Sequence, residues 1–298
     1  MLQDSAIVQT EVTLNSVQQA RRGLAIYFAI LLPITALIEG YMIQSGAMIG
    51  LLVLLLMFMP TLASVIARLT LCEGFGDVSF RVGGRRGVQG MLLALLQPVL
   101  VGLVAYGFAW SVGLAEFAPP ASTADSAAQG AMIRFGLLFL AALIGNFVPQ
   151  LIGGVGEEIG WRGYMLTRLI DARVPYPVLV SGLIWGVWHL PLLVSGLYYA
   201  GPNVLLSALL FMVAITVLSW FYAQLRLATG SIWPAIILHG AWNCIIHDVF
   251  DASTGGAQAS LWIGESGILV MLAVVAVSVL LARVWRPSAA YYRSSTSN

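Results

Sequence analysis

The 298-residue chain has few charged residues: they make up 9% of it, against about 25% in a typical soluble domain. Hydrophobic residues make up 59%, and the mean hydropathy is +0.91. The formal net charge is only +1, so nothing in the composition indicates a nucleic-acid partner. Together with long apolar runs, this balance excludes an ordinary soluble domain and predicts a polytopic membrane protein.

Lysine is absent, and all 14 basic residues are arginine. This excludes mechanisms that need a lysine, such as Schiff-base chemistry or a Ser–Lys pair. The two cysteines, Cys72 and Cys244, lie far apart and outside any metal-binding spacing, so we interpret them as small apolar packing residues. The chain also has no HExxH zincin motif and no GxSxG nucleophile elbow.

Apolar runs of about 20 residues predict eight transmembrane helices. They cover roughly residues 24–44, 47–71, 88–114, 133–153, 176–197, 203–225, 231–250 and 263–284. A further helical stretch at about 156–172 either continues the fourth span or forms a separate helix at the membrane face. The predicted fold is therefore an all-α membrane helix bundle, with no internal repeat and no second domain.

Arginine placement predicts the orientation of the bundle, because cytoplasmic loops carry an excess of positive charge. With eight spans, almost all arginines outside the spans fall on one side, which also holds both termini, and the opposite loops are mainly acidic. We therefore expect a cytoplasmic segment at 1–22, a transmembrane domain at 23–284 and a disordered cytoplasmic tail at 285–298. The loop 117–130 is also expected to be disordered, and the polar N-terminus is not expected to be a cleaved signal peptide.

Two adjacent glutamates and an arginine stand inside the stretch GEEIGWRGYM, residues 156–165. Ionisable residues within a membrane are costly and usually functional. Glu158 and Arg162 have the i,i+4 spacing and order of a favourable ion pair, whereas Glu157 points about 100° away around the helix. We interpret the pair as a brace and Glu157 as the working group. In the alternative, all three lie on a solvated helix, but the surrounding glycines favour close helix packing.

Two histidine motifs follow on later spans. His189 lies in IWGVWHLP, with Trp185 one turn earlier on the same face and Pro191 expected to kink the helix. His239 and Asn243 share one face in LHGAWNC because they are four residues apart. The helical rise places His239 roughly 12 Å and His189 roughly 20 Å from the inner ends of their spans. Both histidines are thus expected to reach a cavity in the cytoplasmic half of the membrane.

Two other ionisable residues within or beside the spans are interpreted as structural. His247 stands beside Asp248 near the expected outer edge, and Glu39 lies near the outer end of the first span. A packing or snorkelling role is the expectation for both.

A free carboxylate, two histidines and an amide supply the groups needed for peptide hydrolysis by activated water. Glu157 is expected to take a proton from water with help from a histidine, while His239 and Asn243 donate hydrogen bonds to the oxyanion. In an alternative use of the same residues, Glu157, His189 and His239 hold Zn²⁺ and leave one position for water.

The three motifs resemble, in their order along the chain, the CPBP/Abi family of type II CAAX prenyl protease-like intramembrane endopeptidases. They are EExxxR, an aromatic residue three positions before a histidine, and HxxxN, and the resemblance covers roughly residues 135–250. In that family the first glutamate and the two histidines carry the chemistry, the asparagine assists, and the second glutamate and the arginine are supporting. The resemblance therefore implies catalytic roles for Glu157, His189, His239 and Asn243, and supporting roles for Glu158 and Arg162.

One position departs from the family pattern: Trp185 stands where a phenylalanine is usual. We expect a reshaped pocket wall and retained activity, with Trp185 in a supporting role. Family members are described both as metalloproteases and as metal-free glutamate proteases. We favour the metal-free interpretation, with no cofactor, and keep Zn²⁺ as the alternative.

The predicted function is therefore that of an intramembrane endopeptidase whose cavity opens towards the cytoplasm. The substrate is a membrane-associated peptide or lipidated protein, and the resemblance implies a prenylated CaaX sequence. The lack of lysine and the abundance of alanine, glycine and arginine indicate a GC-rich bacterial genome, hence a bacterial plasma membrane. Prenylated proteins are not expected there, which favours peptide processing, bacteriocin immunity or control of a membrane regulator.

Two other functions remain as alternatives. A proton-coupled transporter could use the glutamates and histidines as a relay, but the chain has no inverted repeat, and a relay does not need the amide of Asn243. A non-catalytic membrane scaffold could keep the fold, but the complete set of polar residues argues against it.

Overall fold

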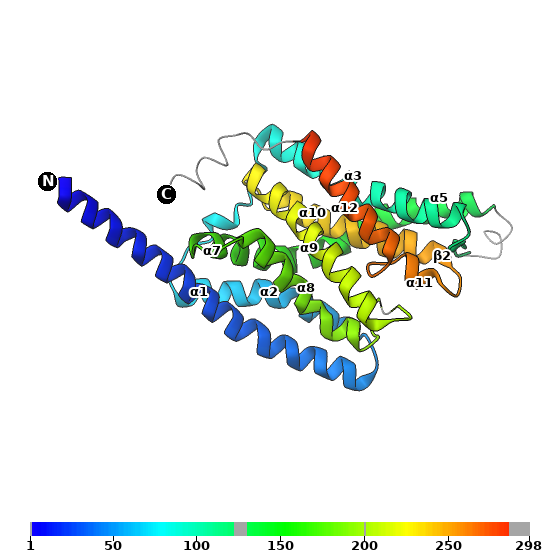
Figure 1. Cartoon of the computed structure of the whole chain (residues 1–298), viewed down its shortest axis with the longest axis horizontal. Helices are drawn as coiled ribbons and strands as arrows, with labels where there is room; N and C mark the ends of the chain where they lie inside the picture. Colours follow the sequence, from blue (N-terminus) through cyan, green and yellow to red (C-terminus); the bar gives the residue numbers. More distant parts are fainter. Residues whose placement is uncertain (1, 122–129, 200, 286–298) are drawn as a thin grey trace.

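The structure is a computed structural model that describes residues 2–121, 130–199 and 201–285, and helices dominate it (Figure 1). The expected disorder at 117–130 and 285–298 concerns mainly residues 122–129 and 286–298, which lie outside the described ones. The α-helices are α1 (Leu2–Ser45), α2 (Gly50–Thr70), α3 (Gly84–Ser111), α5 (Ala131–Ala141), α6 (Phe147–Gly160), α7 (Leu166–Asp171), α8 (Pro177–Val194), α9 (Val204–Thr229), α10 (Trp233–Trp242), α11 (Ala259–Trp262) and α12 (Ile268–Val284).

Shorter elements complete the described part of the chain. Three segments are π-helical: η2 (Ala142–Asn146), η3 (Trp161–Met165) and η4 (Asn243–Phe250). Two are 3₁₀ turns: η1 (Gly76–Val78) and η5 (Asp251–Ser253). The strands β1 (Glu116–Phe117) and β2 (Thr254–Gly255) pair antiparallel, with Glu116 opposite Gly255.

Six helical segments of the described chain are long and apolar enough to cross a membrane: 15–45, 50–70, 84–111, 131–171, 177–194 and 204–229. The molecule is therefore an all-α membrane helix bundle. The expected seventh span, 231–250, is divided between α10 and η4, and the expected eighth begins only at Ile268. The regular helices of these two predicted spans, α10 with 10 residues and α12 with 17, are therefore shorter than the six long segments. The count of eight spans and the cytoplasmic position of both termini stay predictions.

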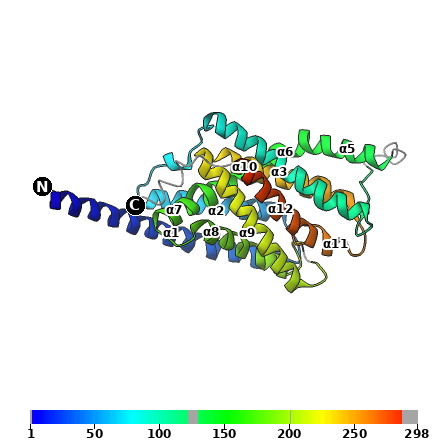
Figure 2. The ribbon, with the colours of Figure 1, turned by 45° about the horizontal axis from the view of Figure 1, so that its top comes forward.

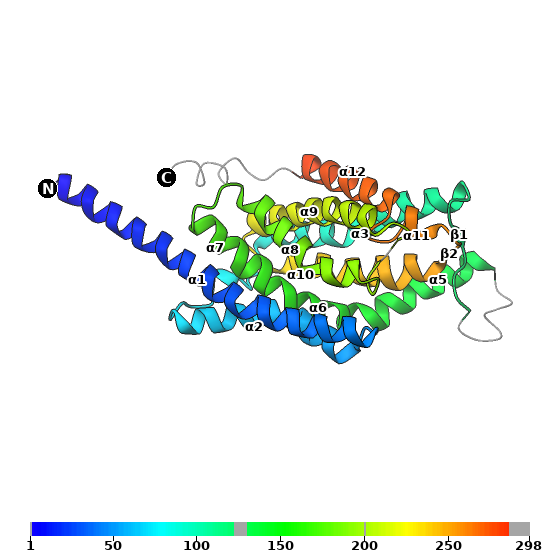
Figure 3. The same ribbon diagram turned by 60° about the horizontal axis from the view of Figure 1, so that its bottom comes forward.

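Helix α1 is much longer than the first predicted span. Its 44 residues correspond to about 66 Å at 1.5 Å per residue, about twice the hydrocarbon thickness of a bilayer. The predicted span 24–44 forms the second half of this helix, and α1 packs mainly on α2 and α7. The first half extends beyond the other helices in all three views (Figures 1, 2 and 3).

The stretch that carries the two glutamates continues the fourth predicted span. Helices α5, α6 and α7, joined by η2 and η3, form one helical segment from Ala131 to Asp171. Of the two possibilities left open by the sequence, the structure therefore shows the continuous helix. The π-helical segment η3 begins at Trp161, directly after α6, and so contains Arg162.

Glycines bring α6 into close contact with its neighbours, and α6 lies between α2 and α10 (Figure 3). A Cβ atom at Gly160 would overlap the backbone carbonyl group of Pro60 in α2. A Cβ atom at Gly154 would lie 2.9 Å from the carbonyl oxygen of Ile236 in α10. Glycine is thus needed on both faces, as expected for close helix packing in a membrane.

Two arginines fix the polar loop between α2 and α3. The Nη1 atom of Arg68 lies 2.5 Å from Oδ1 of Asp77, and its Nη2 atom donates to the carbonyl oxygen of Gly163 at 3.1 Å. Arg168 in α7 pairs with Glu73 at 2.8 Å and with Asp77 at 3.0 Å. Because Gly163 belongs to η3, these bonds connect the loop to the segment that follows the glutamates.

Candidate active site

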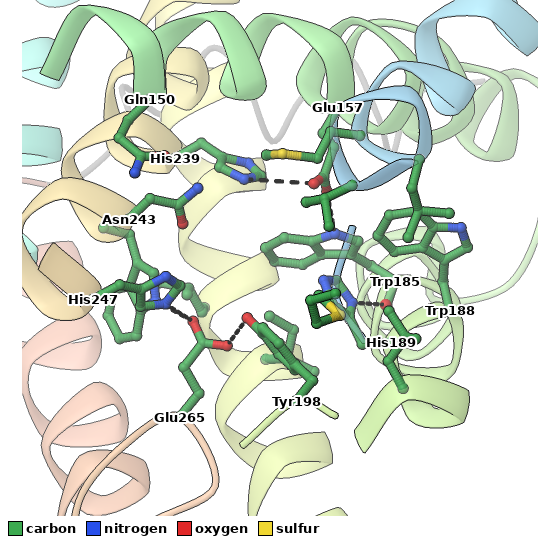
Figure 4. Close-up of a pocket in the computed structure, with 18 of the residues that line it drawn as sticks. Gln150, Glu157, Trp185, Trp188, His189, Tyr198, His239, Asn243, His247 and Glu265 are labelled. Atoms are coloured by element: carbon green, nitrogen blue, oxygen red, sulfur yellow. Dashed lines mark hydrogen bonds and ion pairs between the residues drawn. The ribbon is translucent and has the colours of Figure 1, made fainter. Parts of the chain in front are cut away.

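A cavity of about 230 Å³ lies among α1, α2, α6, α8, α9 and α10, and Figure 4 shows most of its lining. The residues predicted as catalytic all line it: Glu157, His189, His239 and Asn243. Trp185 lines it as well. The structure thus brings together side chains from α6, α8, α10 and η4 that are up to 86 positions apart in the sequence.

The carboxylate of Glu157 is buried, with only 3% of the residue exposed. Its Oε2 atom accepts two indole N–H hydrogen bonds, from Trp161 at 3.1 Å and from Trp185 at 3.0 Å. Its Oε1 atom lies 3.7 Å from Nε2 of His239 (Figure 4). One oxygen is therefore held in place, while the other faces a histidine beyond hydrogen-bond distance.

Glu158 and Arg162 form the predicted i,i+4 ion pair. The Nη1 atom of Arg162 lies 2.8 Å from Oε1 and 3.1 Å from Oε2 of Glu158, and both side chains are completely buried. The guanidinium group lies over the rings of Trp185 and Tyr222, 4.1 Å and 4.4 Å from their centroids. Two aromatic faces and a carboxylate thus stabilise this buried cation.

His239 contacts both glutamates. Its Nδ1 atom lies 2.9 Å from Oε1 of Glu158, on the opposite side of the ring from the nitrogen that faces Glu157. Because a carboxylate only accepts hydrogen bonds, the contact with Glu158 assigns a proton to Nδ1. Glu158 therefore orients His239 in addition to pairing with Arg162, a second role that the sequence did not predict.

His189 lies beside Trp185 in the cavity wall (Figure 4). Its Nδ1 atom lies 2.8 Å from the carbonyl oxygen of Trp185, so this nitrogen is the donor. The ring also packs edge-on against Trp188, with 4.8 Å between centroids. Within the described chain no hydrogen bond joins His189 to Glu157 or His239, so a shared substrate or water would have to connect them.

The side chain of Asn243 lies between His239 and His247 in the cavity wall (Figure 4). It is half-buried, and its amide makes no hydrogen bond to another described residue. Asn243 is the first residue of η4, yet it stays on the same wall as His239, one helical turn away. Its donor and acceptor atoms are therefore available to a ligand in the cavity.

A second polar cluster forms part of the same wall. The Nε2 atom of His247 lies 3.0 Å from Oε1 of Glu265, and the other oxygen of Glu265 accepts a hydrogen bond from Tyr198 at 2.5 Å. The indole of Trp242 also donates to Glu265. His247 was expected at the outer edge in a structural role, but it lines the cavity one turn beyond Asn243. Glu265 reaches the same wall because the residues before α12 fold back onto η4, a turn that the apolar run at 263–284 does not predict.

The described side chains of the cavity do not form a preassembled Zn²⁺ site. In the part of the chain that the structure describes, no group of three or more His, Cys, Asp and Glu side chains is placed to hold a metal ion. Oε2 of Glu157 accepts from two indoles, and the Nδ1 atoms of His189 and His239 are bonded to a carbonyl group and to Glu158. Oε1 of Glu157 and the two Nε2 atoms are left free, but they are not placed as three ligands of one ion, so Glu157, His189 and His239 as arranged here do not form a three-ligand zinc site.

Residues 137–245 match the family model described as type II CAAX prenyl endopeptidase Rce1-like. This range contains all three motifs, from Glu157 to Asn243, and runs from the second half of α5 to the first residues of η4. No curated protein matches the chain. The match confirms the resemblance seen in the sequence and supports a CAAX-type membrane protease at the level of the family.

Proposed function

We propose that this protein is an intramembrane endopeptidase that hydrolyses a peptide bond of a membrane-associated substrate with water activated at Glu157. The observation that carries the proposal is the environment of the Glu157 carboxylate. Two indole N–H groups hold its Oε2 atom, and its Oε1 atom faces Nε2 of His239 across 3.7 Å at the cavity wall.

The spacing between Glu157 and His239 suits one water molecule. Two polar atoms 3.7 Å apart can both lie about 2.8 Å from the same water oxygen. Glu157 takes a proton from this water as its oxygen forms a bond to the scissile carbonyl carbon. The proton then passes to the leaving amine, directly or through His189, as the C–N bond breaks.

Asn243 is the proposed donor to the oxyanion that forms on the carbonyl oxygen. Its amide has no other partner in the described structure and lies on the same wall as His239, which supplies a second donor when Nε2 carries a proton. Glu158 and Arg162 do not line the cavity. They act as positioning residues, because Glu158 fixes the Nδ1 side of His239 and Arg162 compensates the buried charge of Glu158.

The walls of the cavity indicate the kind of substrate. Apolar side chains of Leu56, Met57, Trp188, Leu192 and Trp242 line it beside the polar groups, which suits a peptide segment embedded in the membrane or carrying a lipid. The proposed setting is a bacterial plasma membrane. The cavity lining includes Met48, Tyr198 and Glu265 from the connections at the end of the bundle opposite the two termini, so a cavity open towards the cytoplasm does not agree with cytoplasmic termini. In this setting the substrates would be membrane peptides or lipidated protein tails, and a prenylated CaaX sequence is the class that the family match implies.

The test is a cleavage assay with purified protein in detergent. The substrates are a quenched, farnesylated CaaX-type peptide and a panel of unprenylated membrane peptides. The variants are Glu157→Gln and His239→Ala, and Glu116→Gln, an exposed carboxylate on β1, is the matched control. We expect cleavage by the wild type and the control and none by the other two.

A strong zinc chelator is added in parallel, and we expect unchanged rates. Loss of cleavage on chelation that zinc restores would overturn the metal-free mechanism while leaving the protease activity in place. If the folded wild type cleaves no peptide of either class, the proposed function is wrong.

A further inference from the structure

Glu39 lies on the face of α1 that is turned towards the bundle. Tyr27, Leu31, Thr35, Glu39 and Met42 follow one another at helical spacing, and all five are buried. Only 5% of Glu39 is exposed, and the residue lines the same cavity as Glu157 and His239. The snorkelling or packing role expected from the sequence does not account for a carboxylate that reaches the cavity.

The Glu39 carboxylate has no partner in the described structure. Its Oε1 atom is completely buried without a hydrogen bond, and no arginine forms an ion pair with it. The other buried acids of the site differ in this respect: Glu157, Glu158 and Glu265 each accept hydrogen bonds. An unpaired carboxylate in an apolar setting is unfavourable, and an ionisable residue at membrane depth is by default a functional candidate.

The α1–α2 hairpin places Glu39 close to the level of the proposed catalytic glutamate. Glu39 is six residues before the end of α1, and Leu56 is six residues after the start of α2. Both are thus about 9 Å from the turn. The next residue, Met57, approaches α6 directly: its carbonyl oxygen would lie 2.9 Å from a Cβ atom at Gly156, beside Glu157. A group bound at Glu39 therefore lies in the same cavity as Glu157 and at a similar depth in the bundle.

The charge of the cavity wall favours a cationic occupant. Its carboxylates are Glu39, Glu157 and Glu265, and its basic side chains are three histidines, with no arginine among the lining residues described. A guanidinium or ammonium group would supply the hydrogen-bond donors and the positive charge that Glu39 lacks.

We propose that Glu39 forms a substrate subsite that accepts a basic side chain, arginine or lysine, within a few residues of the scissile bond. The proposal rests on the proposed peptidase function and adds a specificity to it. Glu39 does not take part in bond cleavage. It selects the peptide and sets its position relative to Glu157.

The test uses peptides that differ in one charge. Cleavage by the wild type first locates the scissile bond in a neutral membrane peptide. Arginine or its neutral isostere citrulline is then placed at each of the three positions on either side. At one position we expect kcat/KM of the wild type to be at least tenfold higher for arginine. Glu39→Gln should lose this preference, so that its kcat/KM values for the arginine and citrulline peptides become equal.

Two further variants keep the test decisive. Glu39→Asp retains the charge and should retain the preference, whereas Glu116→Gln should behave as the wild type. Binding is measured separately with the inactive Glu157→Gln protein and a fluorescent arginine peptide, whose affinity should fall about tenfold when Glu39→Gln is added. If Glu39→Gln does not fold, the subsite is judged from the ratio of kcat/KM for the arginine and citrulline peptides, measured with the wild type and with Glu39→Asp.

The outcomes separate the two proposals. Cleavage without a preference for arginine at any position, or a preference that survives Glu39→Gln, overturns the subsite and leaves the peptidase intact. If no peptide is cleaved, the peptidase proposal fails, and binding to the Glu157→Gln protein still reports on the subsite.

Discussion

The Nδ1 atom of His239 lies 2.9 Å from Oε1 of Glu158. This contact gives the second glutamate of the EExxxR motif a direct connection to the proposed reaction, although Glu158 does not line the cavity. Its carboxylate fixes the tautomer and the ring plane of His239, and so determines where the Nε2 atom points. Arg162 in turn makes it possible to keep a charged carboxylate in this dry position.

Replacing Glu157 by glutamine should abolish catalysis and keep the fold. Glutamine preserves the shape of the side chain and an acceptor for the indoles of Trp161 and Trp185, but it cannot take a proton from water. A general base typically contributes 10²–10⁴-fold to a rate, so we expect kcat to fall by about 10³-fold. Peptide cleavage and thermal unfolding in detergent are measured together. Activity above a tenth of the wild type would show that another group is the base.

Removing Glu158 should destabilise the protein more than removing Glu157. Glu158→Ala leaves Arg162 buried and unpaired, and breaking a buried ion pair in this way costs about 3–5 kcal/mol. The double variant Glu158→Ala/Arg162→Met should recover most of this stability without recovering activity, because His239 stays unoriented. Thermal unfolding of the wild type, Glu157→Gln, Glu158→Ala and the double variant measures the loss and recovery of stability. Cleavage rates of the same proteins show whether activity returns. Equal stability of Glu158→Ala and the wild type would show that the Glu158–Arg162 ion pair does not stabilise the fold.

The indole of Trp185 should matter because of its hydrogen bond. Trp185→Phe keeps an aromatic ring at this position but removes the N–H that donates to Glu157 at 3.0 Å. Losing one such bond to a charged group corresponds to about 1.5–3 kcal/mol, so we expect kcat/KM to fall roughly 10- to 100-fold.

Trp188→Phe is the matched control for this prediction. Trp188 is also buried and lines the cavity, but its Nε1 atom has no hydrogen-bond partner in the described structure. Its replacement should change kcat/KM by less than a factor of three. If both variants lose activity to the same extent, ring volume rather than the hydrogen bond explains the effect.

The sequence predicts contacts within one helix, but it does not predict contacts between helices. Contacts within one helix follow from spacing: Glu158–Arg162 and the shared wall of His239 and Asn243 were predicted in this way and are present. The same spacing, from Glu157 to Trp161, would also have identified the first indole donor. Whether Glu39 faces the cavity depends on how separate helices pack, which spacing does not determine.

Loops and irregular helices limited the prediction in the same way. Glu265 reaches the cavity because the residues before α12 fold back against η4, and the apolar run at 263–284 gave no sign of that turn. The division of the seventh predicted span into α10 and η4 was also not visible in the sequence, because its pattern of apolar and polar residues does not distinguish an α-helix from a π-helix. Hydrophobicity predicts a membrane helix well but does not report its hydrogen-bond register.

Asn243 should contribute to kcat and little to KM. If its amide donates to an oxyanion that exists only in the transition state, Asn243→Ala lowers kcat by about 10²–10³-fold while substrate affinity is kept. Asn243→Asp should be at least as inactive, because a carboxylate cannot donate and would repel the oxyanion. Steady-state kinetics with the peptide of the cleavage assay separate the two constants. A higher KM with unchanged kcat would show that Asn243 binds the substrate in its ground state instead.

The contact of Gly160 with α2 should be essential for the position of the glutamates. A Cβ atom at Gly160 would overlap the backbone of Pro60, and neither backbone can move without separating α2 from α6. We expect Gly160→Ala to lower the unfolding temperature markedly and to reduce activity together with it. Gly163→Ala, one turn further along, is the control, because its Cβ atom would meet nothing closer than 3.5 Å and alanine is the better helix former. If the two variants unfold at the same temperature, close packing of α6 on α2 does not position the site.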